Sequence, residues 1–187
     1  MAILHQATLT PTKAELVSTW LRRTPWFDGE NAEAHRVAAY RFDDPDGEVG
    51  IESHLFDVDG ALVHVPLTYR SQPLDGAEDW LVGTMEHSVL GTRWVYDALG
   101  DPVYLAEVTR VIREGDQQVR MWVETPEGQV ERQPTMQVRG SGGTGSASGH
   151  VVVVRDPGTV DASVSPAVLT GTWDGQDEPV VLVYLTA

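Results

Sequence analysis

The sequence predicts an α+β fold, in which an antiparallel sheet packs against two main helices and a β-rich half follows. Three observations support it: two stretches of helical periodicity with clear caps, a run of strand-like alternation between them, and a second half of strand-like pattern. The chain has 187 residues, of which 41% are hydrophobic, so it is long enough to bury a sizeable core. We expect one domain, or one and a half.

The first helix is predicted to begin near Thr10. In one alternative Thr10 caps the helix, with Pro11 at the first helical position. In the other, Thr12 caps it, and Glu15 three residues later completes a capping box. Four apolar residues recur at helical spacing and would form one buried stripe: Leu16, Val17, Trp20 and Leu21.

Strands are expected before and after this helix. Alternating residues predict extended segments at residues 3–9, 37–42, 50–58, 61–69 and 80–89. Asp59-Gly60 predicts a tight hairpin turn between two of them. Pro66 has no N–H to donate to a sheet ladder, so it favours an edge position or a bulge.

The second helix is predicted to begin at Asp101-Pro102 and to end at Gly115. Its buried face is expected to hold Leu105, Val108, Val111 and Ile112. From Asp116 onward the pattern is strand-like, with a turn at residues 126–128, and residues 140–149 contain only glycine, serine, alanine and threonine, which is typical of a flexible loop. We therefore divide the chain into an α+β domain (residues 1–115) and a β-rich segment (residues 116–187) that packs on or extends the first sheet.

Composition narrows the classes of partner. Twenty-eight acidic residues against thirteen basic ones give a formal charge of −15, which would repel nucleic acid and an anionic membrane surface. The absence of cysteine excludes disulfides and cysteine-based zinc sites. The N-terminus has no basic leader followed by a long apolar stretch, so a cytoplasmic location is expected.

The stretch from Gly83 to Val103 is the richest in chemically capable side chains. Arg93 and Trp94 could join Asp97 in a cation–π and salt-bridge hub that ties the second helix to the sheet, or they could contact a partner. Trp20 and Trp26 fit either a core seam or a platform for a sugar. The residues expected to contact a partner or ligand are Trp20, Trp26, Glu86, His87, Arg93, Trp94 and Asp97.

Catalytic and metal chemistry find little support. Glu86 and His87 are adjacent on a strand, so they point to opposite faces and cannot form one acid–base pair. Glu52, His54 and His64 could hold zinc if hairpin register brought them together, but ordinary side chains are the favoured interpretation. A G-x-G-x-x-G match at residues 140–145 lacks a following helix and fits a hairpin loop better. We predict no catalytic residue, metal or cofactor.

Four segments carry a resemblance to a known family. The entry segment Trp20-Leu21-Arg22-Arg23-Thr24-Pro25-Trp26-Phe27-Asp28-Gly29 resembles the signature that opens the N-terminal cap domain of bacterial maltokinases. Residues 8–13, 65–70 and 86–97 are similar to the small stand-alone cap-like proteins of actinobacteria. The likeness extends from Met1 to about Gly115.

The resemblance implies a cystatin-like curved sheet with helices and no catalytic residue. It also implies a place in trehalose, maltose or glycogen metabolism, with trehalose synthase or a maltokinase-like enzyme as partner. Kinase-type phosphoryl transfer needs a strand lysine and a second lobe, whereas the single lysine, Lys13, lies in the first helix and the sequence ends at Ala187. We therefore expect a non-catalytic accessory protein that acts by protein–protein contact. The alternative is a module that binds a sugar or another small metabolite.

Overall fold

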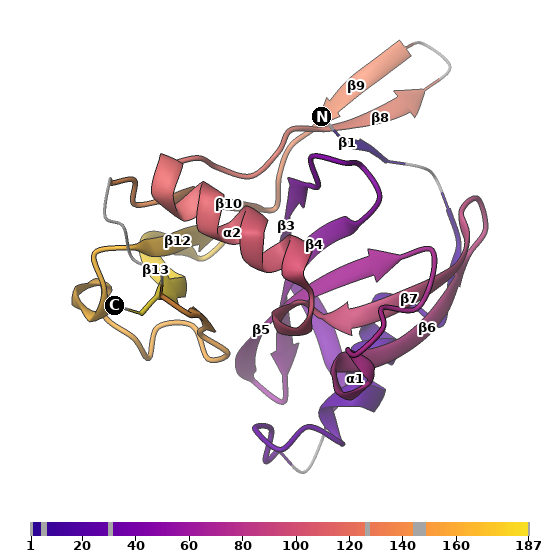
Figure 1. Ribbon diagram of the computed structural model, residues 1–187, viewed down its shortest axis with the longest axis horizontal. Helices are drawn as coiled ribbons and strands as arrows, with labels where there is room; N and C mark the ends of the chain where they lie inside the picture. Colours follow the sequence, from indigo (N-terminus) through magenta and orange to yellow (C-terminus); the bar gives the residue numbers. More distant parts are fainter. Residues whose placement is uncertain (1, 5–6, 30–31, 126–127, 144–148, 187) are drawn as a thin grey trace.

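The computed structural model describes residues 2–4, 7–29, 32–125, 128–143 and 149–186. It confirms the α+β class: a curled antiparallel sheet carries two helices, and the rest of the chain is rich in strands (Figure 1). The curled sheet has the strand order β2-β6-β7-β5-β4-β3. Its strands are β2 (Leu9–Thr10), β3 (Ala34–Asp43), β4 (Gly50–Val58), β5 (Ala61–Arg70), β6 (Leu81–His87) and β7 (Gly91–Asp97).

The hairpin between β4 and β5 forms at the predicted turn. Asp59 and Gly60 both have positive φ angles, 56° and 82°, as a two-residue type I′ turn requires. Strand β5 is an inner strand and pairs with β4 without a register shift, so neither the edge position nor the bulge predicted for Pro66 is found. The ladder between β5 and β7 begins only at Leu67, which lies opposite Asp97. Pro66 lies just outside this ladder, so its missing backbone N–H removes no hydrogen bond to β7.

Helix α1 (Lys13–Leu21) is capped by Thr12 and not by Thr10. The Thr12 side chain accepts a hydrogen bond from the Glu15 N–H, and a Glu15 carboxylate oxygen accepts one from the Thr12 N–H at 2.8 Å. This is the capping box that the sequence offered as the second start. The whole predicted apolar stripe is buried against one face of the curled sheet: Leu16, Val17, Trp20 and Leu21.

Helix α2 (Pro102–Glu114) has the predicted ends. Asp101 caps it by accepting from the Val103 N–H at 3.0 Å, and Gly115 ends it with a φ of 67°. The buried Asp101 carboxylate also accepts two hydrogen bonds from Arg70 of β5, both 2.7 Å long. Of the predicted buried face, Leu105 is only partly buried, and Tyr104 is fully buried instead.

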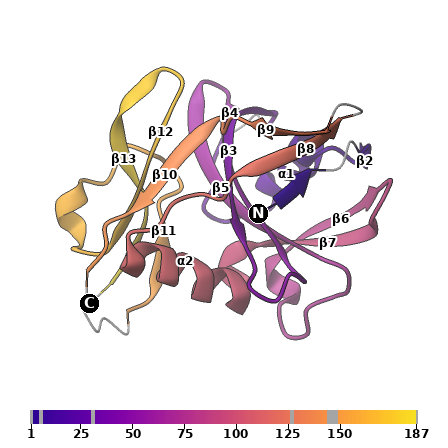
Figure 2. The same cartoon turned by 90° about the horizontal axis from the view of Figure 1, so that it is seen from above.

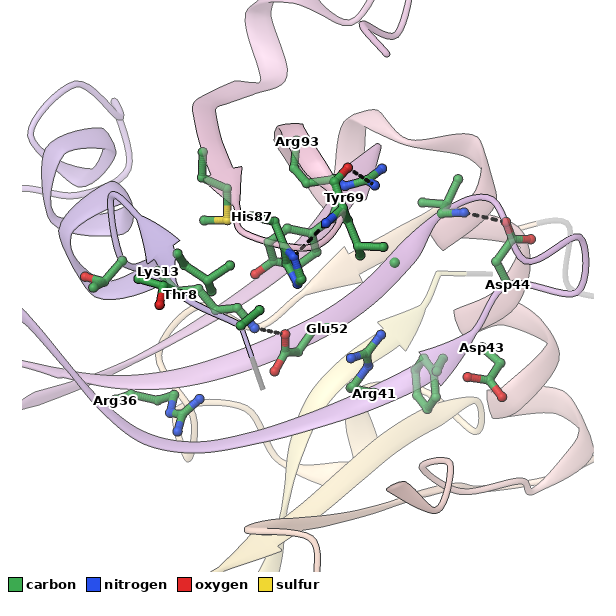
Figure 3. A pocket seen from close by; sticks show the side chains of 18 of the residues that line it. Thr8, Lys13, Arg36, Arg41, Asp43, Asp44, Glu52, Tyr69, His87 and Arg93 are labelled. Carbon is green, nitrogen blue, oxygen red and sulfur yellow. Dashed lines mark hydrogen bonds and ion pairs between the residues drawn. The ribbon is translucent and has the colours of Figure 1, made fainter. Parts of the chain in front are cut away.

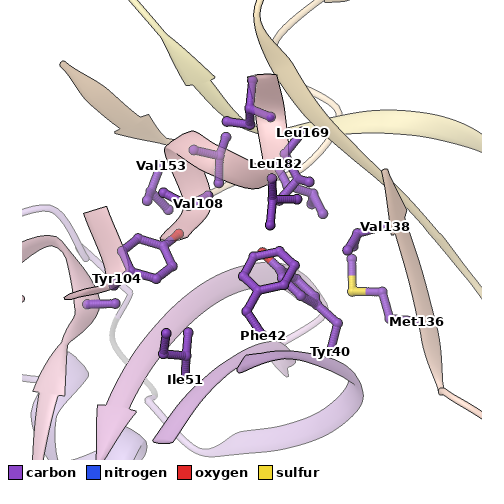
Figure 4. Packing of buried hydrophobic residues seen from close by; sticks show 14 of the residues in the cluster. Tyr40, Phe42, Ile51, Tyr104, Val108, Met136, Val138, Val153, Leu169 and Leu182 are labelled. Carbon is purple, nitrogen blue, oxygen red and sulfur yellow. The ribbon is translucent and has the colours of Figure 1, made fainter. Parts of the chain in front are cut away.

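A second sheet, of order β10-β12-β13-β11, lies on the side of the curled sheet that faces α2 (Figure 2). Its strands are β10 (Met136–Gly140), β11 (Val151–Val153), β12 (Val168–Trp173) and β13 (Gln176–Leu185). Phe42 and Ile51 of the curled sheet pack with Val108 of α2 and Leu182 of β13 in one core (Figure 4). This core crosses the predicted boundary at residue 115.

Smaller elements complete the fold. A third sheet joins β1 (Ala2–Leu4), β8 (Met121–Thr125) and β9 (Gly128–Arg132), and there are short 3₁₀ helices at Glu78–Trp80, Ala98–Gly100 and Ala162–Val164. No helix among the described residues combines the length and apolarity needed to cross a bilayer. The predicted turn at residues 126–128 lies mostly outside the described residues.

The glycine-rich segment at residues 140–149 begins as packed structure. Gly140 is the last residue of β10, and a side chain there would meet the Val111 carbonyl oxygen at 2.1 Å. The Gly142 N–H donates to the Ile112 carbonyl at 2.9 Å. Residues 144–148, with Gly145 of the G-x-G-x-x-G match, lie outside the described residues. The first glycines therefore allow the strand to approach the end of α2 closely.

Candidate functional site

The face of the curled sheet under α1 is only partly covered. A nine-residue helix is about 14 Å long, and its apolar stripe covers one part of that face. The remainder forms an open groove of about 1110 Å³ (Figure 3). Its walls are the first turn of α1, the β3–β4 turn and the β6–β7 hairpin.

Alternate residues of β4 form the floor of this groove. Gly50, Glu52 and Phe56 point toward it, as the two-residue period of a strand requires. Gly50 lies opposite Tyr69 of β5, and a side chain at Gly50 would come within 3.4 Å of the Tyr69 Cβ. Glycine at this position therefore leaves the Tyr69 ring open to the groove.

A polar cluster lies on the floor beside α1. The Lys13 ammonium forms an ion pair with Glu52 and lies 5.2 Å from the centre of the Tyr69 ring. The Tyr69 hydroxyl is 3.1 Å from Nε2 of the buried His54, and that nitrogen is 3.7 Å from Glu52. The single lysine of the chain thus reaches from the start of the helix to the middle of the sheet.

Nearby positive charges keep Glu52 ionised, and burial keeps His54 neutral. Burial alone would raise the pKa of Glu52, but the positive charges of Lys13 and Arg41 outweigh it and hold that pKa well below its usual range. Burial lowers the pKa of His54 to about 3, against the opposing effect of Glu52. At neutral pH the floor therefore holds a carboxylate paired with an ammonium, next to an uncharged imidazole.

Basic side chains are concentrated in this groove. Five of the thirteen basic residues of the chain line it, but only four of the 28 acidic ones. Two of the basic residues come from β3, one from the β6–β7 hairpin, one from β9 and one from α1. They are Arg36, Arg41, Arg93, Arg132 and Lys13. The groove is therefore much less acidic than the protein as a whole.

Two of the sequence-predicted residues line the groove and hold its wall. Nδ1 of His87 accepts hydrogen bonds from two backbone N–H groups of the β6–β7 turn, at 3.2 and 3.1 Å, and Arg93 donates to the Leu90 carbonyl at 2.6 Å. Glu86 accepts a hydrogen bond from the Thr92 hydroxyl at 2.7 Å, and Trp94 lies opposite Arg70 in the β5–β7 ladder. Neither Glu86 nor Trp94 lines the groove.

The other predicted residues, Trp20, Trp26 and Asp97, lie together around Arg155, where the C-terminal half contacts the curled sheet. Arg155 forms an ion pair with the buried Asp97, and its guanidinium lies 4.7 Å from the centre of the Trp26 ring. Trp26 in turn packs edge-on against Trp20, with ring centres 5.5 Å apart. The predicted hub of Arg93 and Asp97 is therefore wrong, since Arg155 is the partner of Asp97.

His64 lies near Arg155 and does not line the groove. Nδ1 of His64 is 3.2 Å from the Val154 carbonyl and so donates to it, while Nε2 is 3.1 Å from the Tyr40 hydroxyl. Burial, together with Arg155, lowers the pKa of His64 to about 3. Because His64 faces away from Glu52 and His54, the zinc alternative fails on geometry.

Sequence reasoning missed most of the groove. The sequence did not predict five of its lining residues as site residues: Lys13, Arg36, Arg41, Tyr69 and Arg132. The turn at Asp59-Gly60 predicts how β4 pairs with β5, but it says nothing about β3. In a regular strand Arg36 and Arg41, five residues apart, would point to opposite faces. An irregularity in β3 between Arg36 and Ala38 shifts this alternation, so both arginines line the groove. No sequence signal marks that shift.

One region of the chain is similar to a known family of domains. Residues 20–101 match the family profile of the maltokinase N-terminal cap domain. The chain thus contains a maltokinase cap-like region. This cap-like region runs from the last turn of α1 to the cap of α2, so it includes strands β3 to β7 but not Lys13 or Arg132. The match confirms the resemblance over a narrower range than expected. No curated protein matches the chain.

Proposed function

We propose that this protein is a non-catalytic, cap-like accessory protein of trehalose, maltose or glycogen metabolism in the cytoplasm. The match of residues 20–101 to the maltokinase cap domain supports it most. In this proposal the curled sheet corresponds to the cystatin-like sheet of the caps, and the protein acts by contact with another protein. Trehalose synthase or a maltokinase-like enzyme is the proposed partner.

The tip of the β6–β7 hairpin offers a surface for such contact. Val89 and Leu90 follow one another at this tip and are 56% and 47% exposed. Exposed apolar side chains that lie together at a projecting turn favour burial against a partner. Both residues belong to the cap-like region.

The experiment mixes the purified chain with purified trehalose synthase, and separately with maltokinase, from the same genome. Sedimentation at about 10 μM of each protein detects complexes of micromolar affinity. We expect one of the two enzymes to form a complex that Leu90→Asp weakens. Val130→Asp is the matched control, because Val130 is 56% exposed on β9, outside the cap-like region. No complex with either enzyme would contradict the proposal.

The proposal that the protein is not an enzyme is tested separately. We expect no maltose-dependent consumption of ATP and no cleavage or transfer of glucans by the purified protein. Turnover that a single substitution in the groove, such as Glu52→Gln, removes without unfolding the chain would contradict it.

A second candidate function is a small-molecule binding module. The groove favours it, because a concave site with a few converging polar groups is the usual form of a ligand pocket. Thermal unfolding in the presence of candidate ligands tests it, since a ligand at about one hundred times its dissociation constant adds about 2.7 kcal/mol of stability.

A further inference from the structure

We propose that the groove binds a small organic molecule carrying a phosphate monoester. This inference rests on the second candidate function, the small-molecule binding module, and specifies its ligand. Two observations support it: several arginine side chains line the groove, and Glu52 and Asp44 there already interact with other groups of the protein.

Two guanidinium groups in the groove have hydrogen-bonding capacity to spare. The Nε atoms of Arg41 and Arg93 are buried and have no hydrogen-bond partner in the described part of the chain. A buried donor without a partner costs free energy, and an oxyanion that accepts from it would recover that cost. Guanidinium groups match the geometry of phosphate oxygens with pairs of parallel donors.

Three arginines come together at one end of the groove. A recess of about 30 Å³ is lined by Arg36, Arg41 and Arg132, and it shares these residues and Glu52 with the groove. Figure 3 shows Arg36 and Arg41 rising from the same strand toward the side of Glu52. We place the phosphoryl group here, because a dianion would offset the mutual repulsion of these cations.

Two of the four acidic residues that line the groove are already engaged within the protein. Glu52 is paired with Lys13, so the carboxylate on the floor is already neutralised. Asp44 accepts three backbone N–H bonds from its own β3–β4 turn, at distances from 2.8 to 3.1 Å. An incoming phosphate therefore meets cations at the recess, although the protein as a whole repels anions.

The size of the groove indicates an ester rather than the free ion. Its volume of about 1110 Å³ is on the scale of sites that hold whole organic ligands. Beyond the recess it offers the Tyr69 ring, the Thr8 hydroxyl and the Leu90 side chain. A polar organic group can contact these while its phosphate remains on the arginines.

Calorimetric titration of the full chain with three probes tests the proposal. The probes are glucose 1-phosphate, a compact monoester rich in hydroxyls, together with inorganic phosphate and glucose. We expect glucose 1-phosphate to bind, inorganic phosphate to bind at least about tenfold more weakly, and glucose to give no saturable heat. Raising the salt concentration should weaken the binding of the ester.

Variants locate the site. Arg36→Gln and Arg41→Gln should each weaken the binding of glucose 1-phosphate about tenfold or more. Arg36 is exposed, so its variant should fold even if that of Arg41 does not. Arg22→Gln is the matched control, because Arg22 is exposed, carries the same charge and does not line the groove. It should change the affinity less than twofold.

The other outcomes overturn the proposal in distinguishable ways. Equal binding of glucose and glucose 1-phosphate would overturn the phosphate and retain the binding module. Inorganic phosphate binding as tightly as the ester would overturn the organic part. Binding that survives both groove variants would overturn the location. No binding of any probe at about 10 mM, which corresponds to less than about 3 kcal/mol of affinity, would overturn the phosphate site together with the binding module.

Discussion

The two faces of the curled sheet differ, although they are built from alternate residues of the same strands. On β4, Ile51 and Leu55 face α2 and are fully buried in an apolar core. Glu52 and Phe56, next to them in sequence, face α1, and there an ion pair and an apolar core lie side by side. One face is closed by a helix and a second sheet, whereas the other is covered in part by the nine-residue helix α1.

This difference indicates that one face of the curled sheet stabilises the fold and that the other is open for binding. The closed face joins the C-terminal half to the cap-like region through one continuous core. The half-open face holds a groove that is lined by five of the thirteen basic residues. We therefore expect substitutions at the closed face to change the free energy of unfolding, and substitutions in the groove to change ligand affinity.

The largest effect is expected where the C-terminal half meets the first sheet. Arg155→Ala should lower the free energy of unfolding by about 3–5 kcal/mol, because it leaves the Asp97 carboxylate buried without its partner. Urea denaturation measures it. Arg120→Ala is the control, since Arg120 is exposed and lies 3.7 Å from Glu131, and it should cost less than about 1 kcal/mol. Equal losses would contradict the assignment.

Acid should weaken the fold through His54 and His64, which are buried and neutral. The folded-state pKa values of His54 and His64 are both about 3, against about 6.5 in the unfolded chain. The unfolded chain therefore binds the extra protons first, and stability is complete above pH 6.5 and falls as the pH drops toward 3. Each histidine should contribute a slope of about 1.4 kcal/mol per pH unit in that window.

A substitution separates this slope from that of the carboxylates. His64→Gln should reduce the loss of stability between pH 6.5 and 5, measured as the shift of the urea midpoint. His35→Gln should leave it unchanged, because His35 is 69% exposed. A pH dependence identical in all three proteins would show that His64 is not held neutral.

A smaller effect is expected at the helix that borders the groove. Thr12→Ala should destabilise the protein by about 1 kcal/mol, because it removes one half of the capping box. Thr12→Ser retains the hydroxyl and should cost much less. If both variants lost the same stability, the methyl group of Thr12 rather than the cap would be responsible.

The smallest effect is expected in the groove itself. Arg36→Gln and Arg132→Gln should change the free energy of unfolding by no more than about 0.5 kcal/mol, because both side chains are exposed. Thermal and urea unfolding measure this change. A loss above about 1 kcal/mol would mean that these arginines support the fold, which would remove the contrast between the two faces.

The local features of the fold were largely predictable from the sequence. The caps at Asp101 and Gly115, the Asp59-Gly60 turn and the stripe of α1 follow from rules that act over a few residues. The position of Pro66 in an inner strand was not predictable, because it depends on where the ladder with β7 begins, far along the chain.

The candidate site was much less predictable. His87 and Arg93 were selected from a region rich in charge and aromatic rings, and both line the groove. Lys13 and Arg132 join them from elements more than one hundred residues apart in sequence. Contacts of that range depend on the packing of whole sheets, which no short pattern specifies.

The central claim is that the open face of the sheet holds a phosphate on arginine side chains. Nitrogen-15 spectra of the arginine Nε–H groups during addition of glucose 1-phosphate test it most directly. We predict saturable shifts of Arg36 and Arg41, which line the recess where the phosphoryl group is placed, and no shift of Arg22. Unchanged Arg36 and Arg41 resonances at saturating ester, or the same shifts with glucose, would contradict the claim.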